Sequence, residues 1–254
     1  MALSDDELDR YARHIVLREI GGPGQARLRR ARVLCVGAGG LGSPALLYLA
    51  AAGVGTLGIA DDDIVSLSNL QRQVLHATDR IGARKTDSAI EALRAINPHV
   101  TVEAHPVRLT AENAEALIGA YDMTLDGSDN FATRHLVNAI CVKLGKPLIA
   151  AAIGQWEGQL SVYGAPGPCY ACVFPETPAE GLAPSCAQAG VLGALAGVMG
   201  ALQAAEAVKR IVGAGESLSG RLLLYDALWA EFRTIAVTRR RDCPVCGGPA
   251  SAST

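Results

Sequence analysis

A chain of 254 residues can form one large α/β domain or two small ones. With 50% hydrophobic and 4% aromatic residues, its composition suits helices packed on a buried sheet. A formal net charge of −2 provides no electrostatic footprint for nucleic acid. The start at Met1 to Arg10 is too acidic for a secretory signal, and the apolar run Ala189 to Leu202 is shorter than the roughly 20 residues that span a bilayer. We therefore expect a cytoplasmic protein with no membrane partner.

The first part of the chain predicts an amphipathic helix over Asp5 to Leu17, followed by a break at Gly21 to Gly24. Strands and helices then alternate over roughly 120 residues, which is the pattern of a doubly wound, Rossmann-like, mostly parallel sheet. The predicted strands are Val33–Val36, Thr56–Ala60, Val100–Ala104, Met123–Leu125 and Pro147–Ala152, and the predicted helices are Ser43–Ala52, Arg84–Ile96, Ala111–Ile118 and Phe131–Leu144.

The character of the sequence changes after Ile153. Three segments look like antiparallel strands around a long helix over Ala189–Val212, and these are Gln159–Tyr163, Arg221–Tyr225 and Phe232–Val237. We interpret 1–254 as a single domain, with an N-terminal helix and a nucleotide-binding part over 1–153 and a C-terminal sheet and zinc part over 154–254.

Two C-x-x-C pairs, Cys169/Cys172 and Cys243/Cys246, are typical of zinc knuckles. Two residues between thiolates allow both sulfurs to reach one tetrahedral ion, and two such pairs close the site. Redox dithiols or ordinary buried thiols are the alternatives. Two pairs in one chain without a secretory signal favour a structural zinc ion over both.

A glycine-rich turn follows the first predicted strand and opens the next helix, with glycines at Gly37, Gly39, Gly40 and Gly42. Such a turn lets backbone N–H groups approach a phosphate. Asp61 follows the second strand, where a carboxylate can bind ribose hydroxyls. This much fits a dehydrogenase equally well.

The segment between Asp61 and the next helix is unlike that of a dehydrogenase, because Arg72 and Lys85 add two cations beside the glycine turn. Two extra cations suit a triphosphate that loses pyrophosphate. Asp129 follows the fourth strand, at the sheet edge where doubly wound folds bind ligands. It is placed either to hold Mg²⁺ or to act as a helix N-cap, and spacing alone leaves both interpretations open.

In combination, these motifs resemble the E1-like adenylyltransferases of the ThiF/MoeB/HesA type, which activate sulfur carrier proteins. The resemblance rests on both zinc knuckles, Arg10-Tyr-Ala-Arg13-His, Gly37-Ala-Gly-Gly-Leu-Gly42, Ser68-Asn-Leu-Gln-Arg-Gln73, Arg84-Lys85 and Asp126-Gly-Ser-Asp-Asn130. It implies a homodimer that uses ATP and Mg²⁺ to adenylate the C-terminal Gly-Gly carboxylate of a ubiquitin-like sulfur carrier, releasing pyrophosphate, for thiamine or molybdopterin synthesis or related sulfur transfer.

The resemblance also implies roles for single residues. Gly40 and Asp61 would contact the nucleotide, Asn69, Arg72 and Lys85 the phosphates, with Ser68 in the same motif, and Asp129 the metal with Asn130 beside it. Arg13 would reach the phosphates of the neighbouring subunit, although composition alone favours a solvated arginine. The fourth-strand motif departs from the usual Asp-Cys-Thr-Asp-Asn at Gly127 and Ser128, both small.

Cys186 ends a polar segment rich in prolines, and the matching cysteine of the thiazole branch can join covalently to the carrier. Exposure alone does not make a thiol reactive, so both a covalent and a noncovalent role stay open. No rhodanese-like domain is recognisable, which implies a separate sulfur-donor protein. An NAD-dependent oxidoreductase and a noncatalytic nucleotide-dependent binding module are the alternative functions.

Overall fold

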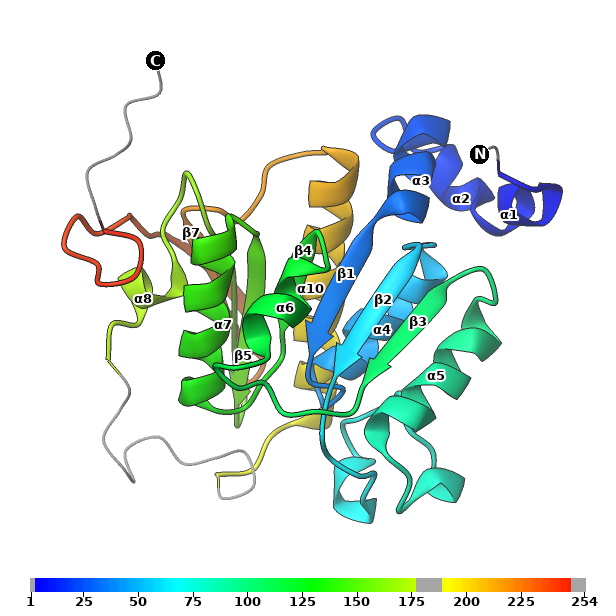
Figure 1. The fold of residues 1–254 in the computed structure, drawn as a ribbon, viewed down its shortest axis with the longest axis horizontal. Coiled ribbons are helices and arrows are strands. Elements are labelled where there is room, and N and C mark those ends of the chain that lie inside the picture. Colours follow the sequence, from blue (N-terminus) through cyan, green and yellow to red (C-terminus); the bar gives the residue numbers. More distant parts are fainter. Residues whose placement is uncertain (1–2, 177–188, 248–254) are drawn as a thin grey trace.

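The computed structural model describes residues 3–176 and 189–247, which form one eight-stranded sheet (Figure 1). The strand order is β3-β2-β1-β4-β5-β6-β7-β8. The bounds are β1 Arg32–Val36, β2 Thr56–Ala60, β3 Thr101–His105, β4 Met123–Asp126, β5 Leu148–Gly154, β6 Glu157–Tyr163, β7 Arg221–Asp226 and β8 Glu231–Ala236. β1 to β5 pair in parallel, and β5 to β8 pair antiparallel. The predicted fold class is confirmed.

Helices cover both faces of the sheet. The helices are α1 Asp5–Arg10, α2 Ala12–Ile15, α3 Gly21–Arg30, α4 Gly42–Ala51, α5 Lys85–Ile96, α6 Ala114–Gly119, α7 Phe131–Leu144, α8 Tyr170–Val173 and α10 Gly193–Val212, with 3₁₀ turns at η1 Leu67–Asn69 and η2 Thr78–Arg80. One core cluster joins α4, α5 and α10 to one face, and a second joins α6 and α7 to the other. None of the helices in the described ranges is long and apolar enough to cross a bilayer.

The reversal of strand order determines where a ligand can bind. β1 lies between β2 and β4, so the chain leaves β1 towards one side of the sheet and later returns to its other side. The crevice at the carboxyl ends of strands beside such a reversal is the usual ligand site in doubly wound sheets. In Figure 1 these ends point to the bottom of the view, and the segment between β2 and α5 lies below them.

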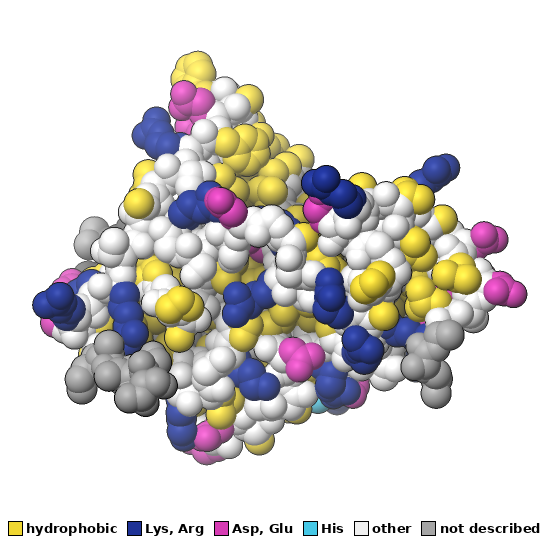
Figure 2. All heavy atoms as spheres, turned by 90° about the horizontal axis from the view of Figure 1, so that it is seen from above, with side chains coloured by type: hydrophobic (Ala, Val, Ile, Leu, Met, Phe, Trp, Pro, Cys, Tyr) yellow, Lys and Arg dark blue, Asp and Glu magenta, His cyan; other side chains and the backbone are white. Residues whose placement is uncertain are grey.

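The amino ends of the parallel strands, at the top of Figure 1, face the viewer in Figure 2. Lys and Arg side chains are spread over this face between hydrophobic patches, and they do not gather into one basic surface. The charged groups at this edge include the ion pair between Arg32 and Glu103.

Two predictions about the N-terminal region are wrong. The expected helix over Asp5 to Leu17 is divided into α1 and α2 at Tyr11, whose side chain is buried, whereas Leu8 is exposed. The expected break at Gly21 to Gly24 is the beginning of α3. Pro23 falls in the first turn of that helix, where a missing N–H costs nothing, and Gly21 has the positive φ of 57° that redirects the chain before it.

Candidate functional site

The glycine turn between β1 and α4 is a tight loop with free N–H groups. A Cβ atom at Gly42 would lie 1.9 Å from the carbonyl oxygen of Gly37, and Gly37 itself has a φ of 90°, so both positions require glycine. Within the described residues, no acceptor takes the N–H groups of Gly39, Gly40 and Leu41. Free N–H groups at the start of a helix favour an anion such as phosphate.

Asp61 lies directly against this loop. Its Oδ2 atom accepts a hydrogen bond of 2.8 Å from the N–H of Ala38, and its Oδ1 atom accepts one of 2.9 Å from the N–H of Asp63. The carboxylate is partly exposed, so its remaining lone pairs stay available to hydroxyl donors. The structure thus brings the predicted ribose-binding residue to the predicted phosphate loop.

The segment between β2 and α5 folds back over the glycine turn. Its two ends are joined by an antiparallel bridge between Ile64 and Arg84 and by a 2.9 Å hydrogen bond from the N–H of Val65 to the carbonyl of Ala83. These contacts close residues 61–84 into a compact loop, the excursion between β2 and α5. Gly193, at the start of α10, packs so closely on it that a Cβ there would lie 2.2 Å from the carbonyl oxygen of Gln71.

The side chain of Arg72 lies against the glycine turn. A Cβ at Gly40 would lie 3.5 Å from the Cγ atom of Arg72, and the guanidinium donates a 3.1 Å hydrogen bond to the carbonyl of Ser68. The side chain of Ser68 is exposed and that of Asn69 is partly buried, both on the same turn. The structure therefore groups Ser68, Asn69 and Arg72 beside the phosphate loop.

Lys85 begins α5 and is 5% exposed. Its Nζ atom lies 2.8 Å from Oδ2 of Asp63, whose side chain is mostly exposed. Burial lowers the pKa of the neighbouring His76, the Lys85 ammonium acts in the same direction, and His76 contacts the loop at Ala38. Lys85 is thus a buried cation at the site, held by one exposed carboxylate.

The loop after β4 carries two carboxylates in different environments. Asp126 is fully buried, and burial raises its pKa, while Arg134 and the N–H of Ser128 act in the opposite direction. Asp129 is exposed and has no hydrogen bond or ion pair to any residue that the structure describes. The N-cap of α7 is Asn130, whose Oδ1 atom accepts a 2.9 Å hydrogen bond from the N–H of Thr133. The N-cap interpretation of Asp129 is therefore wrong, and its carboxylate remains free for a metal.

Arg13 is not brought to this site. It is exposed on α2, which lies at the amino ends of the parallel strands, opposite the edge that carries the glycine turn (Figure 1). Tyr11, at the start of the same short helix, packs against Gly53, which precedes β2. Any action of Arg13 on a phosphate therefore requires the site of another subunit.

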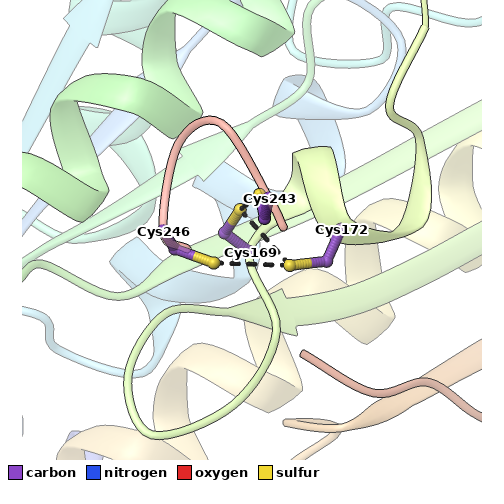
Figure 3. A group of neighbouring side chains, drawn as sticks. All are labelled: Cys169, Cys172, Cys243 and Cys246. Atoms are coloured by element: carbon purple, nitrogen blue, oxygen red, sulfur yellow. Dashed lines mark hydrogen bonds between the residues drawn. The ribbon is translucent and has the colours of Figure 1, made fainter. Parts of the chain in front are cut away.

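The four knuckle cysteines converge from two distant segments, as Figure 3 shows. Sulfur–sulfur distances are 3.8 Å for Cys169/Cys172, 3.6 Å for Cys169/Cys243 and 3.3 Å for Cys172/Cys246, and all four sulfurs lie within 4.8 Å of one another. A tetrahedral ion with metal–sulfur bonds of about 2.3 Å requires sulfurs about 3.8 Å apart. The predicted cluster is therefore assembled as a group that can hold a metal ion.

Backbone geometry supports this cluster. A Cβ at Gly247 would lie 2.3 Å from the carbonyl oxygen of Cys243, so the second knuckle turn requires glycine. The N–H of Arg240 donates to the sulfur of Cys172 at 3.4 Å. Burial opposes ionisation of Cys243, but the N–H groups of Cys246 and Val245 outweigh it and lower the pKa of that thiol to about 6. Burial raises the pKa of Cys169 and Cys172, so a metal ion would displace protons there.

The remaining cysteines divide in two. Cys35 and Cys141 are buried, and burial raises the pKa of each thiol to about 12, as expected for small hydrophobic core residues. Cys186 lies outside the described residues.

Two site residues have no counterpart among the predicted ones. His76 is 7% exposed and contacts the carbonyl of Ala38, and Gln73 is 4% exposed, with its Nε2 atom 3.6 Å from where a Cβ of Gly39 would be. The Oε1 atom of Gln73 is buried and has no hydrogen-bond partner in the described part of the chain. Both follow Arg72 closely in the sequence, but only the folded excursion turns their side chains to the loop.

Known proteins of similar sequence and structure match nearly the whole chain. The model of the ThiF family matches residues 11–245. A sulfur carrier protein adenylyltransferase of Thermus thermophilus is 53% identical over 97% of this chain and 93% of its own length. The SAMP-activating enzyme E1 of Haloferax volcanii is 49% identical over 97% of this chain and 92% of its own length. The crystal structure of E. coli MccB with MccA-N7isoAsn has the same fold, with a TM-score of 0.84 and 23% identity, over 96% of this chain and 76% of that chain.

The doubly wound sheet, with the glycine turn and the basic excursion at the carboxyl ends of its strands, defines an α/β protein whose site is suited to a nucleotide. Within that class the chain belongs to the ThiF family. The resemblance inferred from the motifs is thereby confirmed.

Proposed function

We propose that the protein adenylates the C-terminal Gly-Gly carboxylate of a ubiquitin-like sulfur carrier protein, using ATP and releasing pyrophosphate. One observation carries the proposal: three kinds of group lie together at the carboxyl ends of the parallel strands. They are the N–H groups of the glycine turn and the carboxylate of Asp129, which have no partner among the described residues, and the cations Arg72 and Lys85. Relatives of nearly equal length bear the names sulfur carrier protein adenylyltransferase and SAMP-activating enzyme E1. The proposal places the chain among the adenylyltransferases.

The site suits attack by a carboxylate on the α-phosphate of ATP. The carboxylate oxygen forms a bond to the α-phosphorus, the bond from that phosphorus to the bridging oxygen breaks, and the electron pair leaves with pyrophosphate. A carboxylate is already a nucleophile, so no general base is needed. Negative charge grows on the leaving group, and Arg72, Lys85 and the N–H groups of Gly39 and Gly40 are placed to stabilise it. Asp61 would bind the ribose.

The free carboxylate of Asp129 fits a magnesium ion, because Mg²⁺ prefers one or two carboxylates together with phosphate oxygens. When bound, the ion neutralises phosphate charge. Asn130 would contribute less, since its side-chain oxygen already caps α7. For the cysteine cluster we propose zinc, because four thiolates in a tetrahedral arrangement leave no open position and suit that ion.

For the carrier we propose the outer hairpin of β7 and β8 as the docking surface. Every residue of β8 is exposed, and β8 is the edge strand of the sheet. Large apolar side chains are exposed along this hairpin, including Leu228, Trp229 at 74%, Phe232 and Ile235. An exposed edge with apolar side chains invites pairing with another protein. β7 pairs with β6, which continues the same sheet towards the nucleotide site.

A homodimer is the second part of the partner proposal. Arg13 lies at the far edge of its own sheet, so its implied contact with phosphate belongs to the neighbouring subunit's site. Exposed apolar side chains of the excursion, Ile64, Leu67 and Val74, are suited to a subunit contact. We further propose that 1–254 acts as one domain, in a reducing cytoplasm that keeps the thiols free, with sulfur supplied by a separate donor protein.

The oxidoreductase and the noncatalytic alternatives predict different behaviour in one assay. Exchange of labelled pyrophosphate into ATP requires reversible adenylation. We expect exchange with Mg²⁺ and a carrier ending in Gly-Gly, and none when the terminal glycine is removed. Absence of exchange with every carrier encoded in the same genome contradicts the proposed function. Tight binding of NAD without binding of ATP would favour the oxidoreductase.

A further inference from the structure

His76 joins the basic excursion to the phosphate loop. It lies four residues after Arg72 in the sequence and is almost fully buried. Its Nε2 atom lies 2.9 Å from the carbonyl oxygen of Ala38, and its Nδ1 atom lies 2.9 Å from the hydroxyl of Ser88 on α5. Three elements that are separate in the sequence therefore meet at one imidazole ring.

The partners determine which ring nitrogen carries the proton. A carbonyl oxygen only accepts, so Nε2 donates to Ala38. Burial, together with the nearby Lys85 ammonium, lowers the pKa of His76, which favours the neutral ring. In that ring Nδ1 accepts, and the Ser88 hydroxyl donates to it. The Ser43 hydroxyl also approaches the Ala38 carbonyl, at the longer distance of 3.4 Å.

The contact with Ala38 has a consequence for its neighbour. In a planar trans peptide the C=O and N–H groups point in opposite directions. Because the carbonyl of Ala38 is turned to His76, the N–H of Gly39 is directed away from it, and no acceptor for that N–H exists in the described part of the chain. The N–H of Ala38 is itself taken by Asp61. The two peptide groups of Ala38 are thus fixed by two side chains from outside the loop.

We propose that His76 is a positioning residue that presents the N–H of Gly39 to a nucleotide phosphate. The inference rests on the nucleotide-binding part of the proposed function. It reaches beyond the motif residues, because both ring nitrogens of His76 are taken by protein partners and the residue acts through the peptide group between Ala38 and Gly39. It also makes a correctly folded excursion a condition for a correctly oriented phosphate loop.

The test compares three variants in binding of ATP and of adenosine, without a carrier. His76→Asn keeps a polar group near the Nδ1 position and loses the donor to Ala38. We expect it to bind ATP about tenfold more weakly, with adenosine binding unchanged, since one hydrogen bond to a charged group is lost. His76→Gln retains a donor near the Nε2 position, and Ser88→Ala leaves the Ala38 contact in place. Both should bind ATP within about threefold of wild type.

Kinetics provide the second readout. In pyrophosphate exchange, His76→Asn should raise KM for ATP about tenfold with little change in kcat, because the phosphate contact exists already in the ground state. Three results overturn the inference: wild-type ATP binding by His76→Asn, equal loss of ATP and adenosine together with a lowered Tm, or a wild-type chain that binds adenosine as tightly as ATP. A wild-type chain that prefers ATP but shows no exchange contradicts the proposed adenylation and leaves the comparison of variants decisive.

Discussion

The Nζ atom of Lys85 lies 2.8 Å from Oδ2 of Asp63, so the buried cation of the phosphate site is paired with a carboxylate that faces solvent. Under the proposed function, the carboxylate of Asp63 neutralises the Lys85 ammonium until phosphate oxygens take over that role. Because Asp63 is mostly exposed, it tolerates the loss of its partner, whereas a buried ammonium without a counter-charge is costly.

Lys85→Ala should therefore abolish catalysis and leave the fold intact. We expect a loss of at least about a hundredfold in the rate of pyrophosphate exchange, typical of removing one group that stabilises developing charge. Circular dichroism should be that of wild type. Lys143→Ala, which removes an exposed lysine on α7, is the matched control, and it should keep the exchange rate within a few-fold. Wild-type exchange by Lys85→Ala would mean that the phosphates lie elsewhere.

Arg72→Ala should also remove exchange without unfolding the protein. The aliphatic part of the side chain packs on Gly40, and among the described residues the guanidinium donates a hydrogen bond only to the backbone carbonyl of Ser68, so the structural loss is small. Arg94→Ala, at an exposed position on α5, is the control for removing an arginine and should behave as wild type. An unchanged exchange rate in Arg72→Ala contradicts the placement of the triphosphate.

Subunit mixing tests the role of Arg13. Arg13→Ala and Arg72→Ala should each be inactive alone. If Arg13 acts on the neighbouring subunit, a mixed dimer has one site with both lesions and one intact site, and random mixing should restore about a quarter of the wild-type activity. No recovery, in a sample shown to contain mixed dimers, would mean that Arg13 acts within its own chain or not at all.

Metal removal should affect the two halves of the protein differently. The cysteine cluster links α8 to the segment that follows β8. β8 is the last strand of the sheet order, whereas the glycine turn follows β1 near the other end of that order. We expect one zinc per chain by mass spectrometry, and chelation should weaken carrier binding before ATP binding. Cys172→Ser should lose the zinc, whereas Cys141→Ala, at a buried thiol outside the cluster, should retain it. Equal loss of carrier and ATP binding on chelation would contradict this separation.

Carrier docking on the outer hairpin predicts a selective defect. Phe232 stacks on Tyr225 and is half exposed on the edge strand, so Phe232→Glu places a charge on the proposed contact surface. Its KM for the carrier should rise at least tenfold, as for a residue that anchors an interface, while ATP binding is unchanged. The matched variant Thr234→Glu introduces the same charge on the same strand without removing an aromatic ring. Wild-type KM for Phe232→Glu would exclude the hairpin as the docking surface.

Regular elements of this protein were predictable because their signals are local. α7 has the predicted bounds, Phe131–Leu144, since Asn130 caps its start and Gly145 with a φ of 63° ends it. The glycine turn, Asp61 and the cysteine pairs are likewise recognisable from spacing. By contrast, Gly21 to Gly24 were predicted as a break, because composition does not reveal that Pro23 occupies a first helical turn.

The parts of the site that were missed depend on tertiary structure. The excursion between β2 and α5 contains only short 3₁₀ turns, so its sequence has no periodicity from which to predict a direction for His76 or Gln73. Their side chains meet the glycine loop only in the folded segment, whose two ends are joined by the bridge between Ile64 and Arg84. For the same reason, spacing could not predict that Asp126 is buried and Asp129 exposed.

The central claim is that a carrier carboxylate attacks the α-phosphate of ATP, and product analysis tests it most directly. A carrier ending in Gly-Gly is incubated with the protein, ATP, Mg²⁺ and hydroxylamine, which captures an acyl adenylate as a hydroxamate. The account predicts a carrier modified at its C-terminal glycine, with AMP and pyrophosphate formed in equal amounts. Formation of ADP and phosphate, or an unmodified carrier in the presence of active protein, would contradict it.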